Sequence, residues 1–173
     1  WAIDLNIPTV LVTFHPETKG SSIEDQLKCI DEIMHYLADK FQLVITMPNA
    51  DTNGLEIRKI YDKYKDSDRV HLVENFGTQG YFSCMNHVKF IIGNSSSGII
   101  EAASLNKYVI DVGARQKGRI TGKNVRHVEM DSEKVKRSID NVIHLGTFDG
   151  ENIYGSGNAS KLIISELKKL EGV

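Results

Sequence analysis

A polar turn rich in serine and glycine follows a short apolar run near the middle of the chain. The apolar run is Phe90–Ile92, Gly93 ends it, and Asn94–Gly98 (NSSSG) precedes a short apolar segment that carries Glu101. This order predicts a strand, a tight turn and a helix N-terminus, where unpaired N–H groups and the helix dipole attract phosphate. Serine hydroxyls there can bond phosphate oxygens or simply cap the helix. On this turn alone, an ordinary N-capped helix after a buried strand is the simpler interpretation.

A histidine and a glutamate stand where they could act on a ligand of that turn. His15 follows the first apolar run and precedes Pro16, so it could serve as general acid or base, or donate to a phosphate. The alternative is a histidine that is only hydrogen-bonded within a loop. Glu101 could accept both ribose hydroxyls of a nucleotide whose diphosphate lies on Ser95 and Ser96. The alternative for Glu101 is a carboxylate that only interacts with the helix dipole.

Three cations follow the next apolar run in a glycine-bearing loop, namely Arg115, Lys117 and Arg119. They could neutralise a diphosphate, and an arginine can hold it with two hydrogen bonds. A solvated basic loop is the alternative.

The elements that must position these side chains are short apolar strands that alternate with amphipathic helices. The expected strands are Thr9–Phe14, Leu43–Met47, Val70–Val73, Phe90–Ile92, Tyr108–Val112 and Val125–Val128. The expected helices are Ile23 to about Phe41, Leu55–Tyr64, Tyr81–His87, Asp131-Ser132 to about Leu145, and a last segment near the C-terminus. The first of them is expected to start behind a capping box formed by Ser21 and Glu24. The last is expected to face inward with Leu162, Ile163, Leu167 and Leu170. Apolar strands alternating with helices predict an α/β fold, a doubly wound parallel sheet of Rossmann-like type in a single domain over 1–173.

The common strand order of such a sheet, 3-2-1-4-5-6, makes strands one and four neighbours at the point where ligands bind. The loops at their carboxyl ends read HPETKGSS and GNSSSG. Two polar loops that face each other across one crevice favour the phosphate-site interpretation of the serine turn.

Composition excludes several classes of function. The net charge of -2 and pI near 6.3, with no basic run, argue against nucleic acid. No apolar stretch approaches the roughly 18 residues of a membrane span, so no membrane partner is expected. Cys29 and Cys84 form neither a metal motif nor a disulfide framework, which favours a cytoplasmic protein. The dinucleotide and P-loop glycine motifs are absent, and the calcium-like start at Asn49 has Ile60 where a glutamate is needed. No metal and no cofactor are therefore expected.

Three motifs in one order resemble the hydrolysing UDP-N-acetylglucosamine 2-epimerases of sialic-acid and legionaminic-acid pathways. The motifs are VTFHPET, MPNADTNG and IGNSSSGIIEAAS with GARQKGR after it, and the resemblance extends from about Leu5 to Leu170. It implies the glycosyltransferase-B arrangement, two Rossmann-like domains with the active site between them. This chain resembles the C-terminal domain, and its last helix is expected to cross toward the other domain.

The resemblance also implies a reaction and a set of roles. UDP leaves C1 as the C2 proton is lost, and water adds to the resulting 2-acetamidoglucal to give a sugar of the N-acetylmannosamine type. Ser95 and Ser96 would bind the diphosphate, Glu101 the ribose and Arg115 a phosphate of UDP, with His15 as the active-site histidine. Asn49 and Asn53 would border the sugar.

The expected partners are UDP or a UDP-N-acetylhexosamine, the N-terminal domain that is missing here, and further copies of the chain in a homo-oligomer. Family members keep the catalytic carboxylates mainly in the N-terminal half, so this chain alone is expected to be inactive. Two alternatives stay open: half of a glycosyltransferase of the same architecture, and a stand-alone nucleotide-sugar-binding module.

Overall fold

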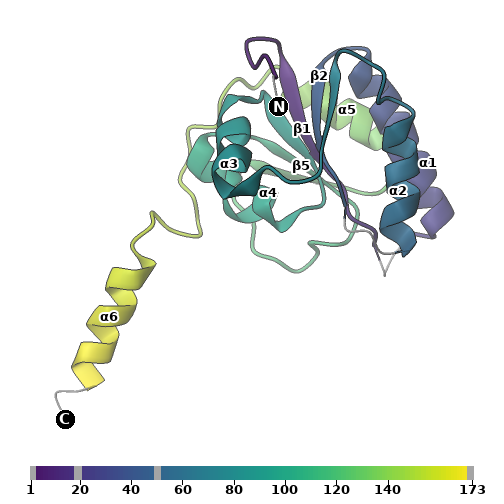
Figure 1. The fold of residues 1–173 in the computed structure, drawn as a ribbon. Helices are drawn as coiled ribbons and strands as arrows, with labels where there is room; N and C mark the ends of the chain where they lie inside the picture. The colour runs from purple at the N-terminus through teal and green to yellow at the C-terminus, as the bar shows by residue number, and fades with distance from the viewer. Residues whose placement is uncertain (1–2, 18–20, 49–51, 171–173) are drawn as a thin grey trace.

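Six parallel strands form one sheet in the order β3-β2-β1-β4-β5-β6 (Figure 1). The structure is a computed structural model, and it describes residues 3–17, 21–48 and 52–170. The strands are β1 (Thr9–Thr13), β2 (Gln42–Thr46), β3 (Val70–Val73), β4 (Phe90–Gly93), β5 (Val109–Val112) and β6 (Val125–Val128). The predicted fold class and strand order are confirmed, and β1 pairs directly with both β2 and β4.

Helices cover both faces of this sheet. They are α1 (Ile23–Ala38), α2 (Thr52–Asp62), α3 (Gly77–His87), α4 (Ser96–Ile100), the 3-10 turn η1 (Ala102–Leu105), α5 (Ser132–Val142) and α6 (Ala159–Leu170). In Figure 1, α1, α2 and α5 lie on one side of the strands, and α3 and α4 lie on the other. Each face has its own buried core, because successive strand residues point in opposite directions: Val10 and Val12 belong to one core and Leu11 to the other.

Helix α1 begins at Ile23 as expected, but its N-cap lies one residue later than predicted. Ser22, not Ser21, is the N-cap: its hydroxyl oxygen accepts a hydrogen bond from the Asp25 N–H at 3.1 Å and donates to the Asp25 carboxylate at 2.9 Å. The carbonyl of Ser21 is instead bonded by the side chain of Gln26 at 2.9 Å. The Ser21/Glu24 capping box was therefore wrong by one position in register.

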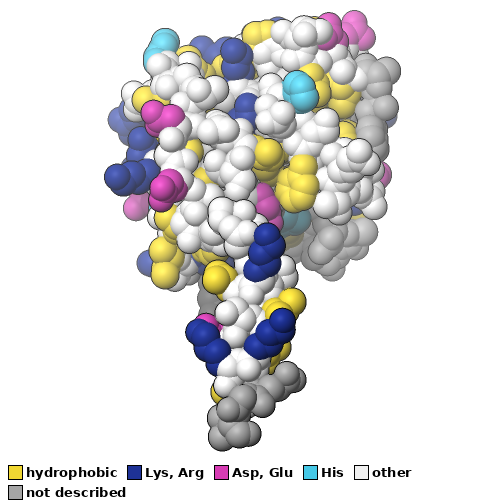
Figure 2. Space-filling view, turned by 90° about the vertical axis from the view of Figure 1, so that its left-hand side faces the viewer, with side chains coloured by type: hydrophobic (Ala, Val, Ile, Leu, Met, Phe, Trp, Pro, Cys, Tyr) yellow, Lys and Arg dark blue, Asp and Glu magenta, His cyan; other side chains and the backbone are white. Residues whose placement is uncertain are grey.

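The last helix differs from its prediction more strongly. Helix α6 forms as expected, but it extends away from the sheet, at the lower left of Figure 1, and none of its residues is buried. Its four predicted core residues are between 55% and 71% exposed. The prediction that they face inward was wrong, because an amphipathic pattern shows that a helix has an apolar face but not which surface covers it. Figure 2 shows the apolar and basic side chains of this projecting segment.

Candidate functional site

The carboxyl ends of β1 and β4 meet as predicted, and a glycine makes their close approach possible. Thr13 and Gly93 are paired in the register of the two strands. Gly93 has φ +142°, and a Cβ at this position would lie 1.9 Å from the carbonyl oxygen of Thr13. No larger residue fits without moving the backbone. The glycine thus fixes where the chain leaves β4 and where the serine turn begins.

Asn94 joins the two loops that follow these strands. Its side chain is fully buried. The amide oxygen accepts the His15 N–H at 2.7 Å, and the amide nitrogen donates to the His15 carbonyl at 2.8 Å. These two bonds hold His15, which is half-buried, at the crevice between β1 and β4. The sequence reasoning treated Asn94 as part of a turn and did not find this role.

The serine turn is capped by its own side chains. Ser95 is the N-cap of α4, and its hydroxyl oxygen accepts from the Ser97 N–H at 3.4 Å. The hydroxyl of Ser97 in turn lies 2.6 Å from the phenol oxygen of Tyr81, which comes from α3. Ser96 is the first residue of α4. Because α4 has only five residues, its dipole is short, and a phosphate here would depend mainly on local N–H and hydroxyl groups.

Glu101 lies at the C-terminal end of α4 and faces the same crevice. Burial raises the pKa of its carboxyl group above the ordinary glutamate value. Its Oε2 atom is buried and has no hydrogen-bond partner among the described residues. A buried acceptor without a donor is costly, and such a group calls for a ligand that supplies one. The hydroxyl groups of a ribose are donors of the required kind.

The crevice between β1 and β4 encloses about 600 Å³. Besides the serine turn and Glu101, it is lined by the ends of β1 and β2 and by the β3–α3 loop with α3: Thr13, His15, Thr46, Met47, Glu74, Asn75, Phe76, Gly77, Thr78, Tyr81 and Phe82. The aromatic residues Phe76, Tyr81 and Phe82 offer flat apolar surface of the kind on which a base can stack. The sequence analysis did not predict this aromatic side of the crevice. The only signal for it was three aromatic residues close together after β3.

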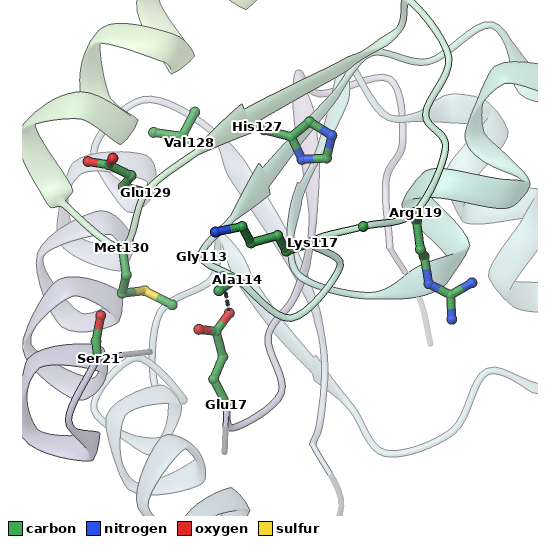
Figure 3. Close-up of a pocket in the computed structure, with 11 residues that line it drawn as sticks. Glu17, Ser21, Gly113, Ala114, Lys117, Arg119, His127, Val128, Glu129 and Met130 are labelled. Atoms are coloured by element: carbon green, nitrogen blue, oxygen red, sulfur yellow. Dashed lines mark hydrogen bonds between the residues drawn. The ribbon is translucent and has the colours of Figure 1, made fainter. Parts of the chain in front are cut away.

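The three cations after β5 do not converge on one point. Arg115 turns toward the serine turn, and its Nη1 atom donates to the carbonyl of Asn94 at 2.9 Å. Lys117 and Arg119 both belong to the wall of a second cavity. In Figure 3 the Lys117 side chain extends across this cavity, whereas the Arg119 guanidinium extends outward from its wall. The structure thus brings Arg115 to the Asn94 carbonyl at the start of the serine turn. Neither Arg115 nor Ser96 is among the described residues that line the crevice.

That second cavity, of about 420 Å³, lies between the loops after β5 and β6. His127 in its wall is hydrogen-bonded through Nδ1 to the buried Asp111 side chain over 2.7 Å, and through Nε2 to the Thr121 hydroxyl over 3.1 Å. Burial raises the pKa of Asp111 above its ordinary value. Figure 3 shows Glu17 below this cavity, at the end of a loop that comes from β1.

Of the two asparagines predicted near the sugar, only Asn53 can be placed. Asn49 lies outside the described residues. Asn53 is exposed in the first turn of α2, and it is not among the described residues that line the crevice.

Within the described ranges, no three histidine, cysteine or acidic side chains are grouped so that they could hold a metal ion. None of the helices described is both long and apolar enough to cross a membrane.

Comparisons with known proteins show which family the chain belongs to. The family model described as UDP-N-acetylglucosamine 2-epimerase matches residues 3–168. A Legionella pneumophila protein named UDP-N,N'-diacetylbacillosamine 2-epimerase (hydrolyzing) is 31% identical over 161 residues, covering 92% of this chain and 42% of that protein. A Campylobacter jejuni GDP/UDP-N,N'-diacetylbacillosamine 2-epimerase (hydrolyzing) is 38% identical over 118 residues, covering 66% of this chain and 30% of that protein.

A solved structure shares the fold. The UDP-GlcNAc 2-epimerase from Neisseria meningitidis bound to UDP-GlcNAc superposes with a TM-score of 0.71 at 24% identity, covering 96% of this chain and 46% of that one. The expected fold, a Rossmann-like half of a glycosyltransferase-B arrangement, agrees with this match. The chain spans less than half the length of each of these relatives. Since the family model matches nearly its whole length, the chain belongs to the UDP-N-acetylglucosamine 2-epimerase family.

Proposed function

We propose that this chain is the UDP-binding C-terminal domain of a hydrolysing UDP-N-acetylglucosamine 2-epimerase. The observation that carries the proposal is the Glu101 carboxylate, which faces the crevice beside the serine turn and has a buried oxygen with no hydrogen-bond partner among the described residues. The names of the Legionella and Campylobacter relatives, both hydrolysing 2-epimerases, support the reaction type. The ligand of the Neisseria structure supports a UDP-sugar as the bound molecule.

On this proposal each part of UDP has a partner in the crevice or in the loops beside it. The base would lie against Phe76 and Tyr81, and Glu101 would accept hydrogen bonds from the two ribose hydroxyls. The diphosphate would then reach Ser95 and Ser96, with the guanidinium of Arg115 held at the carbonyl of Asn94, the residue before them. Charge-assisted hydrogen bonds from an arginine to phosphate are among the stronger polar contacts in proteins.

The reaction that we propose, on the family's names and not on the geometry, begins with loss of UDP. The C1–O bond breaks with its electrons going to the diphosphate, the C2 proton leaves to a base, and a C1–C2 double bond forms. Water then adds across that bond, its oxygen at C1 and a proton at C2 on the face opposite to the lost one. Hydroxyl, N–H and guanidinium groups around the diphosphate stabilise the negative charge that develops as it leaves. His15 would act as a proton donor or acceptor near the diphosphate and sugar.

We propose that the base for the C2 proton comes from an N-terminal domain that this chain does not contain. The chain covers 42% of the Legionella relative, which leaves room for a second domain of similar size. The exposed apolar face of α6 is the surface that would pack on that domain. On this proposal the chain binds UDP but catalyses nothing alone, and product formed by the isolated chain would contradict it.

Two buried, unpaired cysteines, Cys29 and Cys84, support a reducing, cytoplasmic location.

A glycosyltransferase of the same architecture remains the second candidate, because it would share the serine turn and the ribose-binding glutamate. The family match and the names of the relatives favour the epimerase. A stand-alone binding module is the third candidate.

Calorimetric titration of this chain with UDP, UMP and UDP-GlcNAc tests the proposal. We expect UDP to bind, and Glu101→Ala to weaken binding by about tenfold, since it removes a charged acceptor of two hydrogen bonds. Glu74→Ala is the matched control, because Glu74 lines the same crevice but its carboxylate pairs with Arg58. If wild type fails to bind UDP at millimolar concentration, or if the two variants lose equal affinity, the assignment of the crevice is wrong.

A further inference from the structure

Glu17 is a buried carboxylate that none of the expected roles uses. It lies in the loop between β1 and α1 and is 6% exposed. Its N–H donates to the Gln26 side-chain oxygen at 2.9 Å, and the Gln26 amide nitrogen donates back to the Glu17 carbonyl at 3.2 Å. These reciprocal bonds to α1 hold the backbone of Glu17 in place. The direction of its side chain is therefore set by the fold.

The carboxylate bonds the backbone of the loop that carries Arg115. Its Oε1 atom accepts the N–H of Ala114 at 2.8 Å and the N–H of Arg115 at 3.0 Å, and the first of these bonds is drawn in Figure 3. Gly113, just before them, has φ +91°, and a Cβ there would lie 2.2 Å from the same oxygen. The loop thus approaches Glu17 so closely that only glycine fits. A buried charge held by two backbone donors is a stable arrangement, whereas an unbonded one is costly.

Together with the bonds of Arg115 and Asn94, these bonds link three loops at the candidate site: the β1–α1 loop, the serine turn and the loop after β5. Arg115 donates to the Asn94 carbonyl at 2.9 Å, and the Asn94 side chain bonds both backbone groups of His15. Glu17 lies two residues after His15 in the same loop. The β1–α1 loop therefore positions the serine turn through the bonds between His15 and Asn94. The same loop positions the backbone of Arg115 through Glu17.

We propose that Glu17 is a positioning residue: by holding the N–H groups of Ala114 and Arg115, it aims the Arg115 guanidinium at the diphosphate site next to Ser95. Glu17 itself does not contact the ligand, because it lies in the wall of the second cavity and not in that of the crevice. The proposal rests on the proposed function for the identity of the ligand, a nucleoside diphosphate. The part that concerns the loop stands on geometry alone.

The first measurement is amide hydrogen exchange on this chain without ligand. In Glu17→Ala we expect the N–H groups of Ala114 and Arg115 to exchange at least about tenfold faster than in wild type, because they lose their acceptor. Glu17→Gln keeps an oxygen at the same place and should restore much of the protection. Glu129→Gln is the matched control, since Glu129 lines the same cavity but bonds the Lys134 ammonium at the surface. Unchanged exchange in Glu17→Ala, at an unchanged melting temperature, would overturn the proposal.

The second measurement is a double-mutant cycle on UDP binding. Glu17→Ala should weaken UDP binding by about tenfold, and it should cause no further loss in a chain that already carries Arg115→Ala, because the two residues act through one contact. UMP, which lacks the second phosphate, should lose less than UDP. Additive losses, or equal losses for UMP and UDP, would show that Glu17 supports the fold in general and does not aim Arg115.

The two proposals fail in different ways. If wild type binds no UDP, the proposed function is wrong, and the exchange experiment still decides whether Glu17 holds the Arg115 loop. If wild type binds UDP and the cycle is additive, the proposed function stands and the role of Glu17 is wrong.

Discussion

The crevice between β1 and β4 and the helix α6 are opposite in how completely the chain determines them. At the crevice, Gly93 permits the close approach to Thr13, and the side chains of Asn94 and Glu17 bond the backbone of distant segments. The positions of His15 and Arg115 therefore follow from contacts within the chain. Helix α6 forms, yet its apolar residues contact no core. The difference teaches that the crevice is held by contacts within the chain, whereas the apolar face of α6 is covered by none of the described residues. Mutations should therefore cost much in the crevice and little in α6.

The largest expected effect is at Gly93. Gly93→Ala should destabilise the fold by about 3–5 kcal/mol, because the new Cβ overlaps the Thr13 carbonyl in a conformation that L residues rarely adopt. Denaturant unfolding followed by circular dichroism measures this loss. Gly77→Ala is the control: Gly77 also has a positive φ, +62°, but a Cβ there meets nothing within 4 Å. It should cost only about 1–2 kcal/mol. Equal losses at the two positions would mean that the β1–β4 contact is not the constraint we describe.

A smaller effect, with a sign that depends on pH, is expected at Glu101. Burial holds the pKa of this carboxyl group above the value it has in the unfolded chain, so the folded state binds the proton more tightly. Its contribution to stability is then greatest below the unfolded pKa and is lost as the pH rises through the folded pKa. Glu101→Gln, which cannot ionise, should remove that loss and be more stable than wild type at neutral pH, while binding UDP less well. Unfolding curves for both proteins from pH 4 to pH 7 test this, and a wild type that gains stability relative to the variant on deprotonation would contradict it.

The smallest effect is expected in α6. The double substitution Leu162→Ser and Leu167→Ser should change the free energy of unfolding by no more than about 0.5 kcal/mol, because both side chains are more than half exposed. Val135→Ala in α5 is the matched helical control: this side chain is fully buried, and its truncation should cost about 1–3 kcal/mol. If the α6 variant is as destabilised as the α5 variant, α6 packs on the sheet in solution and the contrast drawn above is wrong.

Much of the fold was predictable from the sequence because its signals are local. Short β-branched runs such as Thr9–Thr13 predict buried parallel strands, and the helical period of α1 and α5 predicts helices that cover them. The boundaries were less exact: α3 begins at Gly77 rather than Tyr81, and the cap of α1 is Ser22. Such shifts arise because neighbouring residues can cap a helix almost equally well, and tertiary contacts choose among them.

The candidate site was predictable only in part. His15, Ser95 and Glu101 line the crevice, where the topology of the sheet placed them in advance, and their roles there remain predictions. Tyr81, Phe76 and Asn94 were missed, because a phenol, a phenyl ring and a buried amide have no spacing that marks them as ligand-facing. Asn53 does not line the crevice, since a loop motif says what kind of turn forms but not how far it lies from another strand.

The sequence by itself determined the order of strands and helices, the glycine at the end of β4 and the family to which the chain belongs, because each is encoded by residues close together in the chain. Only the tertiary structure decided that Arg115 donates to the Asn94 carbonyl, whereas the Arg119 guanidinium extends outward. The tertiary structure also decided that Glu17 bonds a loop 97 residues further on, and that α6 extends away from the sheet. The physical reason is that electrostatic and apolar contacts form only between groups that the fold brings close together. The type of a residue limits which contacts its side chain can make, and the packing of distant segments selects the partner.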